Sequence, residues 1–578
     1  MNYLAIDFGT SNCVAGRLTL RDGQYKLDTV PLDSGGSKQL PSVVFVRGKN
    51  LPSLDINTSD FERRVRDAVH SEQLRIQREE KEFDSRVATF IKLNRPKVRR
   101  PNPIDYSSNN ESFRRALKQY ERDLEAAPIA LADFLTRDVD EYKRQLKKFF
   151  RPPFSEEEIR HRIRSQMERS SHEDRAKELW DKTFFNAIND PSMETLYGVD
   201  AMSAYSMDSL SGFFMRSPKA FLAVASGPHI DIFTKIVSRL VRYIRRSAEE
   251  YFGEVFDGVV FGRPVNFLGS SVAGEAGNKN ALSIMKNAAH EAGFTAINFV
   301  LEPLAASLAL RRVTLDTSDP ILMIDLGGGT TDVAYLEVDP AGEVNFNVVS
   351  AVGERYGGND LDEAIAKGVV SPELGRGALT ESGSLLPMSI LSNALETRNI
   401  HSQVAFRRGA SEIEKLLELV RDSDRIRVER LKELYLNQLQ HQVILSSEKM
   451  KSGLSGDELV SEAFDFFENP FTVEIGQESY REVVSRELEK ITEVVRRCCA
   501  EVNLGDRPIR VFFTGGVSQD KTVVNSIVEI LPAGSTVAFM PPLISVVGGL
   551  AVIARQLSLS ESETFQPAFV RGIPVERG

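Results

Sequence analysis

The stretch ILMIDLGGGTTDVAYL, residues 321–336, decides the fold of this chain. Apolar residues lie on both sides of a run of glycines and threonines, which is typical of two strands joined by a tight turn. An earlier stretch, YLAIDFGTSNCVAGRL at residues 3–18, has the same form, with Asp7 where the later one has Asp325. Because the same pattern occurs twice, the sequence predicts two similar halves that face each other.

The residues of these turns favour binding of an anion. Glycines allow a bulky ligand to approach the backbone, and several N–H groups in one turn form an anion site to which Thr and Ser hydroxyls add donors. Either turn alone would more often be only a turn, but two together predict a clamp for a polyphosphate. The aspartates that open the turns would then suit Mg²⁺ beside the phosphates, and Asp332 could orient an attacking water. A P-loop is excluded, because the chain has no GxxxxGK[ST] stretch.

Composition narrows the class of protein. The chain has 578 residues, 42% of them hydrophobic and 27% charged, which is typical of a globular protein with several domains. Its net charge of −10 argues against a general nucleic-acid binder. Three cysteines give no disulfide framework, and no apolar run reaches the roughly 20 residues of a membrane span. We therefore expect a cytoplasmic protein without nucleic-acid or membrane partners.

Apolar spacing divides the chain into regions. Residues 60–190 are highly charged with apolar residues three and four apart, which predicts amphipathic helices. After residue 211 strands and helices alternate, which favours an α/β fold with helices covering a mixed sheet. The expected strands are 3–6, 13–20, 40–46, 258–261, 298–301, the two flanking the turn within 321–336, and 510–513. The expected helices are 113–124, 156–163, 233–251, 283–293, 303–312, most of 410–452, and 544–557.

Both turns resemble the two phosphate motifs of the superfamily of actin, sugar kinases and 70-kDa heat-shock proteins. Other segments resemble the heat-shock branch in particular, and their order along the chain makes the resemblance specific. They are LEPLAA at 301–306, FTGGVS at 513–518, GGNDLD at 357–362, EKMKSGLS at 448–455 and SPKAFL at 217–222. Three segments, SPK at 217–219, GGNDLD and GRPVNF at 262–267, most resemble the YegD-type branch, divergent relatives of DnaK. The resemblance covers residues 1–50 and 211–556.

The resemblance implies a bilobed actin-like ATPase fold, in which two ribonuclease-H-like lobes enclose a nucleotide cleft, with a helical insertion added. The implied boundaries are 1–59 and 211–313 for lobe I, 60–210 for the charged helical insertion in lobe I, 314–542 for lobe II with a helical subdomain at about 360–505, and 543–578 for a helix returning to lobe I and a tail. Because the chain stops at Gly578, we expect no β-sandwich domain for peptide binding.

The resemblance also implies roles for individual residues. The catalytic candidates are Lys219, Glu302, Asp332 and Thr330. The candidates for holding Mg²⁺ are Asp7 and Asp325. The candidates for binding ATP or ADP are Gly9, Thr10, Ser11, Asn12, Gly327, Gly328, Gly329, Gly357, Gly358, Glu448, Lys451, Ser455, Gly515 and Gly516. Pro264 matches a proline that relays the nucleotide state between lobes.

Plainer interpretations exist for several of these residues. Lys219 could be a surface lysine, Glu302 a helix cap, and Glu448 with Lys451 a solvated pair on one helix. We expect Cys13 to be a small buried residue and Trp180 to pack among the inserted helices. The sequence departs from the family pattern at Leu543, where many members have Asp, and at Val517, which interrupts a Gly-Gly-Ser turn.

Four functions fit these observations. We favour a chaperone-like protein that binds ATP, hydrolyses it slowly as a Mg²⁺-dependent ATPase and closes its lobes on the nucleotide, with clients or co-chaperones bound through the 60–210 insertion. The alternatives are a non-catalytic ATP-bound interaction scaffold, a small-molecule kinase of the same superfamily and, last, a filament-forming actin relative. The EPxAA and GGxDLD motifs argue against the small-molecule kinase.

Overall fold

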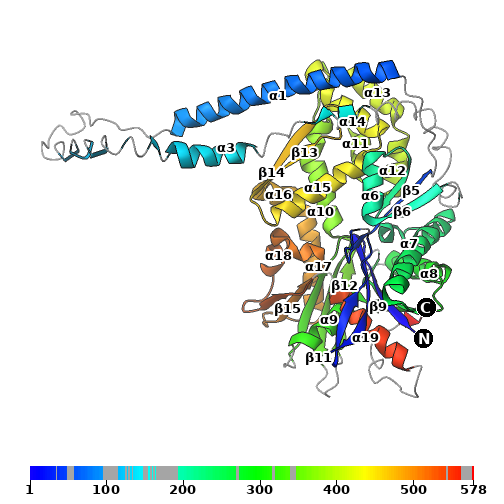
Figure 1. Ribbon diagram of the computed structural model, residues 1–578. Coiled ribbons are helices and arrows are strands. Elements are labelled where there is room, and N and C mark those ends of the chain that lie inside the picture. The colour runs from blue at the N-terminus through cyan, green and yellow to red at the C-terminus, as the bar shows by residue number, and fades with distance from the viewer. Residues whose placement is uncertain are drawn as a thin grey trace. The chain divides into compact units, whose positions relative to one another are not determined.

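The computed structural model describes residues 1–33, 35–48, 58–94, 134–147, 193–267, 272–314, 319–338, 346–541, 545–560 and 576–577, with short pieces between 115 and 190. The chain divides into two compact units. The main unit comprises Met1–Ser53 and His172–Gly578, and the helical unit comprises Leu54–Ser171. Each is described by itself (Figure 1).

The main unit contains a mixed sheet near the N-terminus, here called the first sheet. Its strands run in the order β9 (Ala296–Leu301), β8 (Gly258–Arg263), β1 (Tyr3–Phe8), β2 (Asn12–Arg21) and β3 (Gln24–Thr29). The short strands β4 (Leu40–Pro41) and β17 (Glu576–Arg577) pair with β2 and β9. β1 is antiparallel to β2 and parallel to β8.

A second sheet repeats this arrangement later in the chain. Its order is β16 (Thr536–Phe539), β15 (Arg510–Thr514), β10 (Ile321–Leu326), β11 (Thr331–Val338) and β12 (Phe346–Glu354). β10 is antiparallel to β11 and parallel to β15, as β1 is to β2 and β8. The two predicted turns therefore occupy equivalent places, between the first and second strand of each set.

The central strands of both sheets are buried on both faces. Leu4 and Ile6 of β1 pack in a core with α7 (Pro228–Phe252) and α8 (Val272–Ala292), while Ala5 faces a different core. That other core also holds Ile321 and Met323 of β10, together with α9 (Glu302–Thr314) and α19 (Ser545–Ser560). Since successive side chains of a strand point to opposite faces, these apolar runs read as strands buried on both sides.

α9 contacts strands of both sheets, and α19 contacts α9 and the first sheet. Their packing is close because Gly549 of α19 lies against the Ala305 backbone, where a Cβ would overlap the Ala305 carbonyl. A side chain at this position would push the two helices apart. α9 begins with Glu302, so this packing fixes where the Glu302 carboxylate lies relative to both sheets.

The main unit also contains a small antiparallel sheet, whose strands follow β4 and precede α7 in the sequence. It consists of β6 (Met193–Tyr197), β5 (Val43–Gly48) and β7 (Gly212–Arg216), and α6 (Gly198–Met207) packs on it. Tyr205 of α6 donates its hydroxyl to the Gln438 carbonyl, and Ser209 Oγ donates to the Asn437 carbonyl at 2.5 Å. These bonds hold the small sheet to the segment that precedes α15 (Gln440–Leu454).

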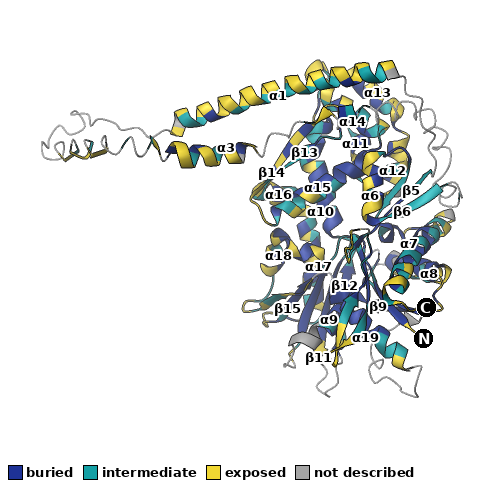
Figure 2. Cartoon of the chain, in the orientation of Figure 1, coloured by how far each residue is buried: buried dark blue, intermediate teal, exposed yellow. Residues whose placement is uncertain are grey.

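The face of the second sheet opposite to α9 and α19, which carries Leu322 and Ile324, is covered by helices that share one large core. Figure 2 shows α10 and α15 as largely buried. The elements of this region are α10 (Gly358–Ile365), α11 (Ser389–Leu395), α12 (Ile400–Arg407), α13 (Ala410–Leu419), α14 (Arg425–Leu436), α15, α16 (Gln477–Val483), α17 (Ser485–Glu501), α18 (Lys521–Val528) and the hairpin of β13 (Leu459–Phe464) and β14 (Phe471–Gly476).

The helical unit is built around the long helix α1 (Thr58–Asn94). A π-helical turn, Phe134–Asp138, leads into α3 (Val139–Lys147), and both pack on the C-terminal half of α1. Phe90 stacks on Tyr142 with ring centroids 4.1 Å apart and on Phe134 at 6.1 Å. Much of α1 is exposed (Figure 2), as the charged amphipathic pattern of this region predicts.

Most of the predicted strands and helices are confirmed, with boundaries shifted by a few residues, but the strand expected at 40–46 is divided into β4 and β5, which belong to different sheets. The largest shift concerns the helix expected at 283–293, which begins at Val272 and is followed by Gly293 in the left-handed region, at φ 104°. The described residues of the helices expected at 113–124 and 156–163 are helical, while the rest of these two segments, Trp180 and Leu543 lie outside the described residues. Within the described chain, no helix is long and apolar enough to cross a membrane.

Candidate functional site

The two glycine-containing turns contact each other. A Cβ on Gly328 would overlap the Ser11 hydroxyl, and a Cβ on Gly329 would lie 2.6 Å from Thr10 Cγ2. A Cβ on Gly9 would overlap the Asn12 carbonyl oxygen of its own turn, and Gly327 N–H donates to the Thr330 carbonyl at 2.9 Å. The predicted meeting of two similar turns is therefore present, and only residues without side chains fit at its centre.

Carboxylates gather beneath these turns. Asp7 lies near the end of β1 and Asp325 near the end of β10, where Asp325 pairs in register with Asp332 of β11. Glu302 is the first residue of α9, directly after β9. Burial, then repulsion from Glu302, raises the pKa of Asp7 to about 7, and Lys219 opposes the rise. The same two causes, joined by repulsion from Asp332 and Asp7, raise the pKa of Asp325 well above its ordinary value.

Lys219 is the cation of this group, and it is not a surface lysine. It lies in a short 3-10 helix, Pro218–Phe221, and only 5% of it is exposed. Its Nζ lies 2.6 Å from Glu302 Oε1. Burial lowers the pKa of Lys219, but Glu302 and Asp7 outweigh that effect, so the pKa is raised and the ammonium stays charged at neutral pH.

Asp332 is fully enclosed. Its Oδ1 accepts a hydrogen bond of 2.6 Å from the N–H of Val265, the residue after Pro264. Burial, then repulsion from Glu302, raises the pKa of Asp332 to about 7, while the Val265 N–H and the Thr330 side chain oppose the rise. A carboxyl with a pKa near 7 has the proton affinity that a general base needs at neutral pH.

The N-terminus of α10 is joined to the second turn. Gly358 N–H donates to the Gly327 carbonyl at 3.0 Å, and Asn359 N–H donates to the Gly328 carbonyl at 2.7 Å. A Cβ on Gly357 would lie 2.9 Å from the Gly328 carbonyl carbon. The structure therefore brings together Gly327, Gly328, Gly357 and Gly358, which are distant in sequence.

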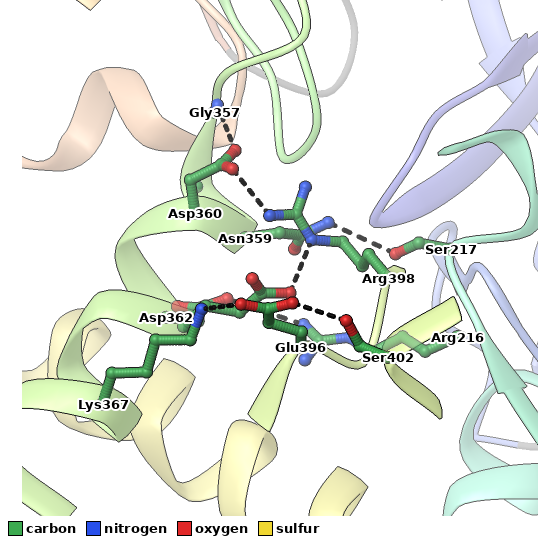
Figure 3. Close-up of polar contacts among 12 residues, drawn as sticks. Arg216, Ser217, Gly357, Asn359, Asp360, Asp362, Lys367, Glu396, Arg398 and Ser402 are labelled. Atoms are coloured by element: carbon green, nitrogen blue, oxygen red, sulfur yellow. Dashed lines mark hydrogen bonds and ion pairs between the residues drawn. The ribbon is translucent and has the colours of Figure 1, made fainter. Parts of the chain in front are cut away.

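Glu448 and Lys451 are engaged in ion pairs with other elements rather than with each other. Lys451 Nζ lies 2.6 Å from Asp362 Oδ1 and donates to the Gly358 carbonyl at 2.9 Å. Glu448 Oε2 lies 2.5 Å from Arg216 Nη2 at the end of β7, and Arg216 also faces the buried Asp362 at 3.8 Å (Figure 3). The interpretation as a solvated helix pair is therefore wrong for these two residues.

Three further residues predicted to bind ATP or ADP divide into two groups. Gly515, at φ 85°, lies against the end of β10, where a Cβ would be 2.5 Å from Asp325 Oδ1. Gly516 opens the next 3-10 turn, beside Val517, which packs on Gly358. Ser455 differs, because it ends α15, and the structure records no side-chain hydrogen bond that joins it to the other predicted residues.

Cys13 follows the first turn, and its thiol is fully buried as expected. It lies 3.2 Å from Ser42 Oγ, and burial raises the pKa of the thiol to about 12. A thiol with so high a pKa is protonated at neutral pH and is a poor nucleophile.

A divalent cation fits the chemistry of this group. Glu302 acts electrostatically on Asp7, Asp325 and Asp332, and Lys219 opposes the rise in pKa of each of these three described aspartates. Such an excess of buried carboxylates favours binding of a cation. Among the described residues, no three His, Cys, Asp or Glu side chains are arranged to ligate a metal directly. Contact through retained water, which Mg²⁺ favours, agrees with that arrangement.

The sequence reasoning missed several residues that hold the site. Ser42 bonds to the first turn, Arg216 pairs with Glu448, and Val265 N–H bonds to Asp332. Asn359 and Asp362 lie within GGNDLD, and the structure buries both. Their place inside that motif is the sequence signal for these two residues, whereas Ser42 and Arg216 lie in no motif.

Comparisons with known proteins agree with the resemblance. A family model described as Hsp70 protein matches residues 231–375. Chaperone protein DnaK of Burkholderia cenocepacia is 29% identical over 169 residues, which are 29% of this chain and 24% of the relative. Chaperone protein DnaK of Thermoplasma acidophilum is 35% identical over 132 residues, 23% of this chain and 19% of the relative. The chain thus spans about a quarter or less of the length of these relatives. The matches confirm the resemblance to Hsp70 proteins, whereas the YegD-type branch stays a prediction.

Proposed function

We propose that this chain, similar to Hsp70 proteins over residues 231–375, binds ATP and ADP with Mg²⁺ between its two turns and hydrolyses ATP slowly. The observation that carries the proposal is the contact of the Gly328 turn with the Ser11 turn above a group of buried carboxylates. Two facing arrays of backbone N–H groups are suited to a polyphosphate, since each bond to a charged oxygen contributes about 1.5–3 kcal/mol.

The phosphates would be held by Gly9, Thr10, Ser11 and Asn12 from one side and by Gly327, Gly328, Gly329 and Thr330 from the other. Asp7 and Asp325 would hold Mg²⁺ through water, and the ion would neutralise charge on the phosphates when bound. Gly357, Gly358, Gly515, Gly516, Lys451, Glu448 and Ser455 would contact the nucleoside. The contacts of Gly358 with Lys451 and of Gly515 with Asp325 support one continuous binding surface.

Three buried side chains would perform the hydrolysis. Lys219 stays charged beside Glu302, and an ammonium in a water-poor site stabilises negative charge that develops on a transferring phosphoryl group. Asp332, with its pKa raised to about 7, would accept a proton from the attacking water, and Glu302 would help to orient that water.

The fold supports a bilobed actin-like ATPase. Each sheet with its helices would form one ribonuclease-H-like lobe, since the two sets of five strands share one order and one pattern of parallel and antiparallel pairs. We propose that nucleotide binding closes the lobes and that the chain acts as a chaperone-like protein, with clients or co-chaperones bound through residues 60–210.

Calorimetry with Mg²⁺-ATP and a single-turnover assay test the proposal. We expect the chain to bind ATP and to release phosphate, and we expect Lys219→Ala to lose turnover while it keeps binding. Lys279→Ala, at an exposed lysine of α8, is the matched control and should behave as the wild type. Absence of ATP binding in the unaltered chain would overturn the proposal.

A non-catalytic scaffold that holds ATP is the second candidate. The separation of Leu54–Ser171 as a compact unit favours it, since none of the proposed site residues lies in that unit. Wild-type chain that binds Mg²⁺-ATP without releasing phosphate, but loses a protein partner when residues 54–171 are deleted, would support the scaffold over the ATPase.

A further inference from the structure

Ser217 has an unusual backbone conformation for its residue type. Its φ of 56° and ψ of 53° lie in the left-handed region, which only Asp22, Gln438 and Asn503 share among the described non-glycine residues. A residue with a Cβ adopts this conformation only where its surroundings enforce it, and such residues concentrate at functional sites. Ser217 is 1% exposed, so the enforcing contacts come from the protein.

One set of contacts ties Ser217 to the first turn. Its N–H donates to the Ser42 carbonyl at 2.8 Å. Ser42 N–H in turn donates to the Ser11 carbonyl at 2.7 Å, and Ser42 Oγ donates to the Gly9 carbonyl at 2.7 Å. Ser42 therefore links the backbone of Ser217 to the first turn.

A second set ties Ser217 to the opposite turn. Asn359 Nδ2 donates to Ser217 Oγ at 3.3 Å, as the dashed line between them marks in Figure 3. The backbone N–H of Asn359 donates to the Gly328 carbonyl at 2.7 Å. Asn359 is 4% exposed, so both of its bonds lie away from water, where they are strongest.

Ser217 also determines the direction in which the chain enters the helix that carries Lys219. It precedes Pro218, and its carbonyl accepts a hydrogen bond of 2.9 Å from Ala220 N–H, which closes the 3-10 turn. The φ of proline is fixed, so the orientation of this turn depends on the backbone of Ser217. The position of the Lys219 ammonium therefore depends on a residue that is linked to the first turn through Ser42 and to the second turn through Asn359.

We propose that Ser217 and Asn359 are positioning residues that place the Lys219 ammonium for phosphoryl chemistry only when both turns are in place. This inference rests on the proposed function. Neither residue contacts the carboxylates in the described structure; each acts through Lys219. The Asn359–Ser217 bond couples closure of the second turn on a phosphate to the position of Lys219.

Ser217→Ala and Asn359→Ala, singly and together, test the inference. The measured quantities are the ATP dissociation constant, by calorimetry, and the single-turnover rate of phosphate release at saturating Mg²⁺-ATP. We expect each single variant to slow phosphate release by about tenfold while the dissociation constant changes less than about twofold, because misplacement affects the transition state more than binding. The double variant should be no slower than either single variant, because each single change already removes the same Asn359–Ser217 hydrogen bond.

Ser371→Ala is the matched control. Ser371 is 2% exposed and donates its hydroxyl to the Lys367 carbonyl within its own helical region, away from both turns. The Ser371→Ala variant should lose as much thermal stability as Ser217→Ala but keep the wild-type rate of phosphate release. Ser217→Gly separates the two features of Ser217, since it keeps the left-handed backbone without strain and still lacks the hydroxyl.

The rates of phosphate release and the ATP affinities of these variants either support or overturn the inference. Slowed release in Ser217→Ala, Ser217→Gly and Asn359→Ala, with affinity kept, supports the inference. A wild-type rate in these variants, or multiplicative losses in the double variant, overturns it while the proposed function stands. Wild-type chain that neither binds nor turns over ATP overturns the proposed function as well.

Discussion

Lys219 Nζ lies 2.6 Å from Glu302 Oε1, and their side chains are only 5% and 11% exposed. The two residues come from separate elements, a 3-10 turn after β7 and the first turn of α9. A pair of charges removed from water is stable only as a pair, because each charge compensates the cost of burying the other.

Lys219→Met should destabilise the nucleotide-free chain by about 3–5 kcal/mol, because Glu302 is then buried without its partner among other carboxylates. Urea unfolding of the nucleotide-free protein measures this. The double variant Lys219→Met/Glu302→Gln should recover part of the loss, since it also removes the uncompensated charge. Equal stabilities of the single and double variants would contradict the assigned pairing.

Gly328→Ala should weaken ATP binding and lower the melting temperature. The new Cβ would overlap the Ser11 hydroxyl and lie 3.0 Å from Ser11 Cβ, so the two turns must separate. Overpacking of this kind costs about 1–3 kcal/mol, which corresponds to roughly 5- to 150-fold in affinity.

Calorimetry with Mg²⁺-ATP, with thermal melting alongside, checks this expectation. Gly35→Ala is the control, because its Cβ would meet only Asp33 Oδ1 at 3.5 Å. Adding Ser11→Ala to Gly328→Ala should restore part of the melting temperature. If the second change gives no recovery, the turns do not meet at these residues.

Stability should fall in acid because of His441, at the second residue of α15. It packs against Phe214 and Tyr205, and burial, then repulsion from Arg216 and Arg407, lowers its pKa to about 3. Below pH 6.5 the unfolded chain takes up a proton on this residue and the folded chain does not. Its contribution to stability is therefore complete above pH 6.5 and is lost as the pH falls toward 3.

His441→Phe keeps the aromatic contacts without the titration. The free energy of unfolding of the wild type, relative to this variant, should fall by about 2 kcal/mol between pH 7 and pH 5, at about 1.4 kcal/mol per pH unit below 6.5. Urea unfolding at both pH values measures the difference. A constant difference would show that His441 titrates normally in the folded protein.

Phe90→Ala should loosen the helical unit by up to about 3 kcal/mol, because Phe90 supplies the stacking contacts with Tyr142 and Phe134. Limited proteolysis should then cleave between residues 58 and 147 at a lower protease concentration. The ATP dissociation constant should stay within about twofold, since no proposed site residue lies in this unit. Leu74→Ala, at a more exposed position on α1, is the control. Loss of ATP binding would contradict the independence of the two units.

The local pattern of the sequence was enough to predict both hairpins. Apolar runs on both sides of glycine-containing turns specify strands through backbone and solvent preferences alone, and the strands that contain Asp7 and Asp325 formed as expected. Helix boundaries were less exact. The helix that carries Ala281 extends further toward the N-terminus than its apolar spacing indicated, since polar residues such as Glu275 continue it.

The sequence by itself determined which residues could bind a phosphate and that their pattern occurs twice. Only the tertiary structure decided that Gly328 touches Ser11, that Lys219 pairs with Glu302, and that Glu448 pairs with Arg216. These contacts join residues from 83 to more than 300 positions apart. Periodicity reports only which face of a segment is buried, whereas such pairs depend on how elements distant in sequence pack together.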